Sequence, residues 1–138
     1  VNIQDEDNQT ALIIASMWGH TDIVDMLIGY GAKLDIQDDE GNTALIYAIQ
    51  EDFPGIAKML IDNNADLNIK DKDENTALIF ASDGEQNEIV EMLIDAGVNV
   101  DAQNGNGETA LMLARHWDNN EMVEMLHKAG AKYKYSVM

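Results

Sequence analysis

The tripeptide Thr-Ala-Leu recurs at an interval of 33 residues, and this interval limits what the chain can fold into more than any other feature. The threonines that open it are Thr10, Thr43, Thr76 and Thr109. A Met-Leu pair returns later in each unit at the same interval, at Met26-Leu27, Met59-Leu60, Met92-Leu93 and Met125-Leu126. Self-similarity at a fixed period of about 20 to 50 residues is typical of repeat proteins, in which one small unit stacks on the next. The sequence therefore predicts a stack of four similar units.

Each unit carries the pattern of two short helices. The threonine suits a helix N-cap, and alanines four residues apart, such as Ala44 and Ala48, lie on one face of the first helix. In the second helix, apolar residues cluster over 56–61, while Lys58 and Asp62 point outward. Helices of this length are marginal alone in water. Each pair must therefore bury its apolar side against the next pair.

Turn residues punctuate the units at matching positions. A glycine or asparagine follows each second helix, where the left-handed conformation of a helix end is tolerated, at Gly31, Asn64, Gly97 and Gly130. Pro54 falls in the first turn of a helix, where its missing N–H costs little. Glu74 is the exception, because its counterparts Asn8, Gly41 and Gly107 all tolerate a positive φ. We expect local strain or a different turn at Glu74.

The first three units read Thr-Ala-Leu-Ile-x-Ala and the fourth reads Thr-Ala-Leu-Met-x-Ala. This frame resembles the ankyrin repeat, a 33-residue unit of a β-turn and two helices around Thr-Pro-Leu-His-x-Ala. The turn Gly19-His20 and the repeat ends Gly31-Ala32 and Gly130-Ala131 also match. The resemblance spans nearly the whole chain and implies an all-α repeat solenoid of helix-turn-helix pairs joined by β-turn fingers. Because the motif's Pro and His are replaced, we expect neighbouring repeats to pack mainly through apolar contacts.

The register gives a single ankyrin-like repeat domain over 1–138 and sets its internal boundaries. Residues 1–4 match the end of a unit, and the repeats span 5–37, 38–70, 71–103 and 104–138. The last repeat reads as a polar C-terminal cap, with His127, Lys128, Lys132 and Lys134. We expect the chain to be the C-terminal part of a longer array. Repeats two and three share 12 of 33 residues, which favours natural divergence and leaves an engineered binding scaffold as a minor alternative.

The acidic charge is concentrated in the body of the chain. The formal net charge is −18, and residues 1–114 hold 23 acidic against 4 basic residues. Such a field repels phosphate backbones, so nucleic acids are poor partner candidates. It favours basic proteins and accelerates their encounter, although the same charge also serves solubility.

The sequence offers little for catalysis or metal binding. There is no cysteine, and no apolar run reaches the roughly 18 residues of a membrane helix. The histidines His20, His116 and His127 lack zinc-site spacing. The stretch 71–75 resembles the start of a calcium loop, but Thr76 and Ser82 occupy the positions of its obligatory Gly and bidentate Glu. We therefore predict no metal, no cofactor, no small-molecule substrate and no enzymatic activity. Met26, Met59, Met92 and Met125 share one register position, which predicts that they lie in the core.

The family resemblance implies that a protein partner binds the concave side, which is formed by the fingers and the first helix of each repeat. The variable finger positions are Glu6, Asp7, Gln9, Asp39, Glu40, Asn42, Lys72, Asp73, Asn75, Gly105, Asn106 and Glu108. The variable positions at the helix ends are Met17, Trp18, Gln50, Glu51, Asp83, Gly84, His116 and Trp117. From these we select as partner-binding residues Glu6, Asp7, Met17, Trp18, Asp39, Glu40, Asn42, Gln50, Glu51, Asp73, Asn75, Asp83, His116 and Trp117.

The two tryptophans of the chain, Trp18 and Trp117, share one register position. Tryptophan is enriched in interface hot spots, and the alternative is that each ring shields its neighbouring turn. We predict a non-catalytic protein-binding module with an acidic concave surface and these two anchors for a basic partner. The competing interpretation is a structural or oligomerising segment of a longer array. The resemblance favours an intracellular location.

Overall fold

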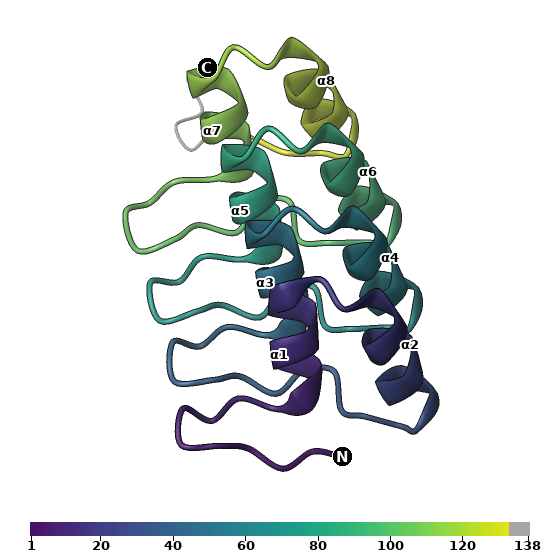
Figure 1. Cartoon of the computed structure of the whole chain (residues 1–138). Helices are drawn as coiled ribbons and strands as arrows, with labels where there is room; N and C mark the ends of the chain where they lie inside the picture. Colours follow the sequence, from purple (N-terminus) through teal and green to yellow (C-terminus); the bar gives the residue numbers. More distant parts are fainter. Residues whose placement is uncertain (133–138) are drawn as a thin grey trace.

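The computed structural model describes residues 1–132, and these form eight α-helices and no strand (Figure 1). In chain order the helices are α1 (Ala11–Trp18), α2 (Thr21–Gly29), α3 (Ala44–Gln50), α4 (Pro54–Asp62), α5 (Ala77–Asp83), α6 (Asn87–Asp95), α7 (Ala110–His116) and α8 (Asn120–Lys128). Each odd-numbered helix is joined by a short turn to the even-numbered helix that follows. The predicted all-α stack of helix-turn-helix pairs is confirmed.

The helices form two parallel rows. One row contains α1, α3, α5 and α7, the other contains α2, α4, α6 and α8, and each helix contacts its equivalents in the neighbouring pairs. The longer loops before α1, α3, α5 and α7 project from the side of the odd-numbered row as fingers (Figure 1). Residues 33 apart in the sequence therefore occupy the same position in adjacent layers.

The threonine of each repeat caps the odd-numbered helix that follows it. Thr43 is extended, with φ −97°, and its Oγ1 accepts a hydrogen bond of 3.2 Å from the backbone N–H of Ile46. Thr10, Thr76 and Thr109 do the same for their helices. These bonds satisfy N–H groups that a helix start leaves without partners, as the sequence predicted. Pro54 occupies the first turn of α4, also as predicted.

The turn residues adopt the conformations that their positions require. Gly31, Gly97 and Gly130, and Asn64 at the equivalent place, have positive φ. Glu74 also has a positive φ, of 64°, and its N–H donates to the carbonyl of Asp71 at 2.9 Å. The equivalent bond closes the second finger, from Gly41 to Asp38. The third finger thus keeps the same turn, so the alternative of a different turn is wrong, and Glu74 pays the steric cost of a left-handed residue.

The core runs between the two helix rows and is continuous from layer to layer. Leu60, Leu93 and Leu126, near the C-terminal ends of the even-numbered helices α4, α6 and α8, are fully buried. The shared methionine position lies at the edge of this core: Met59, Met92 and Met125 are partly buried against it, and Met26 is 55% exposed. The prediction of a core position is therefore wrong for Met26, because no described helix pair precedes α2 to cover it.

A polar ladder also ties the layers together. The Oδ1 atoms of Asn2, Asp35, Asn68 and Asp101 each accept a hydrogen bond, of 2.8 to 3.0 Å, from a backbone N–H 31 residues later. One short polar side chain in each layer thus holds the loop of the next layer. This repeated bond fixes the spacing from which the fingers project.

The two ends of the stack differ. Within residues 1–132, seven of the eight exposed large apolar residues lie in the first 30 residues, and they are Val1, Ile3, Ile14, Trp18, Ile23, Met26 and Tyr30. At the other end His127, Lys128 and Lys132 are exposed, while Lys134 of the predicted cap lies outside the described residues. No helix in the described part of the chain is long and apolar enough to cross a membrane.

Candidate functional site

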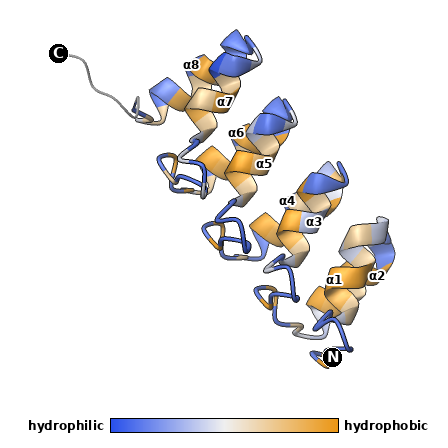
Figure 2. Cartoon of the chain, turned by 90° about the vertical axis from the view of Figure 1, so that its left-hand side faces the viewer, coloured by the Kyte–Doolittle hydropathy of each residue, from blue (hydrophilic) through white to orange (hydrophobic). Residues whose placement is uncertain are grey.

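The predicted partner-binding residues lie on the side of the molecule that we call the finger face. It consists of the four finger tips (residues 5–9, 38–42, 71–75 and 104–108) and of α1, α3, α5 and α7. Figure 2 shows this side, with hydrophilic colour along the fingers and hydrophobic colour along the helices behind them. The finger face is the side built from the fingers and the first helix of each repeat, which the sequence analysis predicted as the partner surface.

Backbone hydrogen bonds join each finger to the next. The N–H of Asp39 donates to the carbonyl of Asp7 at 3.1 Å, and that of Lys72 donates to Glu40 at 3.1 Å. The N–H of Gly105 donates to Asp73 at 3.0 Å. The finger tips therefore form one connected row, and the carboxylates on them are held at a repeated spacing.

The first residue of each finger holds its own turn closed. In the second finger, Oδ1 of Asp38 accepts hydrogen bonds of 3.0 Å from the backbone N–H groups of Glu40 and Asn42. Asp5, Asp71 and Asn104 make the same pair of bonds in their own fingers. These side chains are thus committed to shaping the fingers, which explains why this position holds Asp in the first three fingers and Asn in the fourth.

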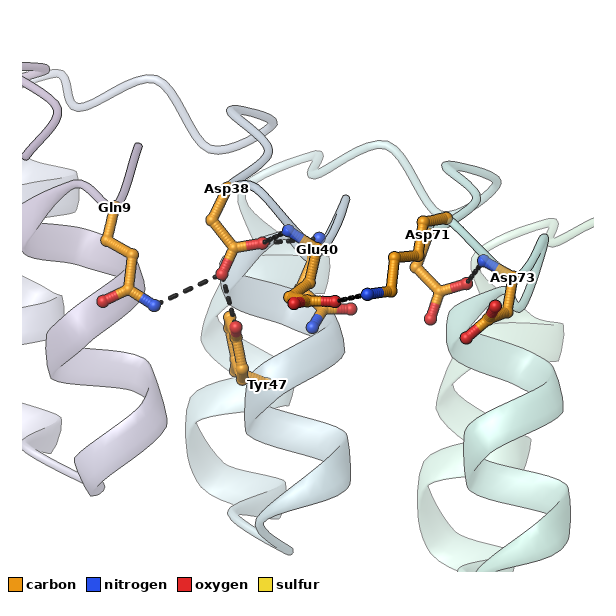
Figure 3. Close-up of polar contacts among 8 residues, drawn as sticks. Gln9, Asp38, Glu40, Tyr47, Asp71 and Asp73 are labelled. Atoms are coloured by element: carbon orange, nitrogen blue, oxygen red, sulfur yellow. Dashed lines mark hydrogen bonds and ion pairs between the residues drawn. The ribbon is translucent and has the colours of Figure 1, made fainter. Parts of the chain in front are cut away.

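The second finger carries an extra contact that the sequence analysis missed. The hydroxyl of Tyr47 on α3 donates a hydrogen bond to Oδ2 of Asp38, and Nε2 of Gln9 approaches the same oxygen at 3.3 Å (Figure 3). Partial burial raises the pKa of Tyr47 most, and the hydrogen bond to Asp38 raises it further. The hydroxyl therefore stays protonated and remains a donor. Ile14, Phe80 and Leu113 occupy the equivalent place without a hydroxyl. A single tyrosine at a register position that is otherwise apolar was the sequence signal that could have revealed this contact.

The predicted site residues differ in how accessible they are. Among them Asn42 is buried, at 8% exposure, so its side chain is not part of the open surface. Met17 and Asn75 are half-buried, and the other predicted residues are exposed. Glu40 forms an ion pair with Lys72 of the next finger, and this hydrogen bond and charge raise the pKa of Lys72 (Figure 3). The charge of Glu40 is therefore partly balanced within the surface.

The two tryptophans stand at opposite ends of the finger face rather than together. Trp18 ends α1 and is 68% exposed. Trp117 follows α7, is 46% exposed, and donates from Nε1 to Oδ1 of Asp83 at 3.0 Å. Its ring also meets the ring of His116 edge-on, with centroids 4.8 Å apart. Trp117 is thus fixed by two neighbours, and neither ring enters the core, as the helical register predicted.

A groove lies between α5 and α7 beside Trp117. It has a volume of about 320 Å³ and is lined by Asp83, Glu108, Met112, Leu113, His116 and Trp117. Glu108 was named as a variable finger position but not selected as a binding residue. Elsewhere the acidic side chains spread along the finger row, and no group of three or more among residues 1–132 converges as a metal site would.

The comparisons with known proteins agree with this geometry. A family model described as ankyrin repeats (3 copies) matches the chain twice, over residues 1–71 and 55–136. The comparison with curated proteins found no significant match. Ankyrin repeats generally mediate interactions between proteins and are typically not catalytic. Since the two family matches together span almost the whole chain, and the helix pairs stack with the family's period, the chain belongs to the ankyrin-repeat family.

Proposed function

We propose that the protein is a non-catalytic binding module that presents the finger face to a basic protein partner. The observation that carries this proposal is the connected row of finger tips. Glu6, Asp7, Asp39 and Asp73 are exposed on it, and the finger-to-finger backbone bonds hold them at a fixed spacing. A rigid row of carboxylates loses little conformational freedom on binding, which favours affinity.

The charge of the whole chain supports the same conclusion. A formal charge of −18 produces a negative field that attracts basic proteins and speeds their association. Salt screens this attraction over a distance of about 10 Å at 0.1 M ionic strength. Binding to the finger face is therefore expected to weaken as salt is raised.

Trp18 and Trp117 supply the apolar contacts that charge alone lacks. Both rings are exposed on the finger face, and Trp117 is hydrogen-bonded to Asp83. Large, rigid aromatic side chains are enriched among the residues that dominate binding energy. We assign them as anchors, surrounded by the carboxylates that orient the partner.

Affinity capture from native lysate at about 20 and about 150 mM salt tests this function. The wild type is compared with a Trp18→Ala, Trp117→Ala double variant, and circular dichroism confirms that the helices are retained. Tyr30→Ala is the control, because Tyr30 is an exposed aromatic at the end of α2, away from the finger face. The proposal predicts that the wild type and the Tyr30→Ala control capture a basic protein. This protein is expected to be lost with the double variant and at the higher salt concentration. Capture of the same proteins by all three chains, or of none, contradicts it.

One observation favours a second candidate function, a structural or oligomerising role. The uncovered face of α1 and α2 exposes Ile14, Ile23 and Met26. Contiguous exposed apolar residues on a soluble protein mark interaction surfaces. Under this function sedimentation velocity shows a mass that rises with concentration, Ile23→Lys abolishes the rise, and the tryptophan variant does not. A constant monomer mass removes this candidate.

A further inference from the structure

The groove between α5 and α7 lies at the boundary between the third and fourth repeats. Its lining combines the ring of Trp117 with the carboxylates of Asp83 and Glu108. Three register positions supply these groups, and each has equivalents at the other boundaries: a helix end of one repeat, and a finger residue and a helix end of the next. At the first boundary these are Met17, Asn42 and Glu51; at the second, Gln50, Asn75 and Gly84; at the third, Asp83, Glu108 and Trp117. At the third boundary the same three register positions thus supply an aromatic ring and two carboxylates to one groove.

Internal contacts hold the three groups in place. Trp117 donates its Nε1–H to Oδ1 of Asp83 at 3.0 Å, which ties α7 to α5 across the boundary. Oε1 of Glu108 accepts a hydrogen bond of 2.9 Å from Nδ2 of Asn104, and the same nitrogen lies 2.9 Å from Oδ1 of Asn75. The indole N–H is therefore already used by the protein, and the ring has only its apolar and π surface left to offer a ligand.

The chemistry of such a groove selects a cation on an apolar stem. Asp83 and Glu108 attract a positive charge, and an indole adds a cation–π attraction for an ammonium or guanidinium group. The side chains of Met112 and Leu113 line the groove and suit the methylene stem of the ligand. A neutral side chain of equal length gains only the apolar contact, and an anion is repelled.

We propose that this groove receives one lysine or arginine side chain of the partner. The inference rests on the proposed function, because it names the chemistry that the finger face recognises at its C-terminal end. It also gives Trp117 and Trp18 different roles: Trp117 lines this charged groove, whereas Trp18, in the first repeat, does not line it.

Two-dimensional ¹H–¹⁵N NMR of the full chain tests the groove without knowledge of the partner. The two tryptophans give two indole N–H signals, assigned with Trp18→Phe. The probes are N-acetyl-lysine methylamide and N-acetyl-arginine methylamide, with N-acetyl-norleucine methylamide plus equal salt as the neutral control. The expected result is a saturable shift of the Trp117 signal with one or both cationic probes, little change at Trp18, and no saturable shift with the norleucine probe.

Charge-matched variants separate the groove from the general negative field. Asp83→Asn with Glu108→Gln is expected to weaken probe binding about tenfold or more. The control is Asp95→Asn with Glu91→Gln, which removes the same two charges from exposed positions on α6 and is expected to bind within about twofold of the wild type. Equal weakening in both variants, an equal shift at Trp18, or an equal response to the norleucine probe overturns the inference.

The outcome is distinguishable from failure of the proposed function. If lysate capture succeeds on the finger face and the Trp117 indole does not respond to either cationic probe, the groove inference is wrong and the binding module stands. If the probes bind as expected and no partner is captured, the groove is a cation site and the proposed function fails.

Discussion

The first and second helix pairs have nearly the same apolar residues at the same register positions, yet their surroundings differ. Ile23 on α2 is 42% exposed and its counterpart Ile56 on α4 is 1% exposed. Leu27 is partly buried, and Leu60 is completely buried. The α3–α4 pair is covered on both sides, by α1–α2 and by α5–α6. Burial in this fold is thus decided by the neighbouring layer rather than by the residue.

The polar contacts of the two pairs differ in the same way. Tyr47 on α3 bonds to Asp38 of its own finger, which Gln9 of the first finger also approaches. Ile14 occupies the equivalent place on α1, is exposed, and leaves Asp5 without that contact. The second finger is therefore also bonded to a side chain of the helix that follows it, and the equivalent bond is absent from the first finger.

A charge placed at the register position shared by Ile23 and Ile56 is expected to give the largest difference in stability between the two helix pairs. Ile56→Lys is expected to cost about 4 kcal/mol or more of unfolding free energy, because it buries a charge with no partner. Ile23→Lys is expected to cost less than about 1 kcal/mol, since the side chain can reach solvent. Urea unfolding followed by circular dichroism measures both. Similar losses for the two variants would mean that the face of α2 is covered in solution.

Truncating Leu27 or Leu60, which share a register position, compares the two helix pairs without adding a charge. Leu60→Ala is expected to lower the unfolding free energy by about 3 kcal/mol, through lost apolar contacts and a cavity that cannot collapse. Leu27→Ala is expected to cost about 1 to 2 kcal/mol, because a partly buried site relaxes. Equal costs in denaturant titrations would contradict the role of the neighbouring layers in burying the leucine position.

Removing the Tyr47 hydroxyl tests the tertiary bond of the second finger. Tyr47→Phe is expected to cost about 1 kcal/mol at neutral pH, because the buried Asp38 carboxylate loses a donor. Burial and the Asp38 bond raise the pKa of Tyr47 above its ordinary value of 10.0, so the folded chain holds this proton more tightly than the unfolded chain. That contribution is complete below pH 10 and is lost as the pH rises through the folded-state pKa.

Urea titrations of wild type and Tyr47→Phe from neutral pH to about pH 11 measure this difference. The advantage of the wild type should shrink on the alkaline side. Because the two proteins differ only at residue 47, the comparison isolates the contribution of the Tyr47 hydroxyl. A difference between the two proteins that stays constant over the whole range would show that the tyrosine proton is not linked to folding.

The helix caps provide the smallest expected contrast. Thr10 and Thr43 are both buried and accept hydrogen bonds of 3.1 and 3.2 Å from the third residue of their helices. Thr10→Ala and Thr43→Ala are each expected to cost about 1 kcal/mol and to agree within about 0.5 kcal/mol. Thermal and urea unfolding check this agreement. A much larger cost at Thr43 would show that the cap also depends on the neighbouring layer.

Much of the fold was predictable because it is local and repeated. The Thr-Ala-Leu interval gave the helix pairs, the caps, the first-turn position of Pro54 and the exposure of both tryptophans. The repeat register could not predict the exposure of Met26. Its counterparts Met59, Met92 and Met125 belong to helix pairs that pack on a preceding pair, and no described pair precedes α1–α2. The register also missed the bond between Tyr47 and Asp38 and the position of Glu108 in the groove at the third repeat boundary. Asn42, selected as a surface residue, is buried against its own finger.

The sequence by itself determined the apolar side of each helix, the caps and turns that bound the helices, and the family to which the chain belongs. These features depend on interactions within a few residues, and the 33-residue period repeats them four times. The tertiary structure decided which equivalent positions are covered, how the fingers join into one row, and where Asp83, Glu108 and Trp117 meet. Those contacts link residues of different layers, and their energies depend on distances that stacking alone sets.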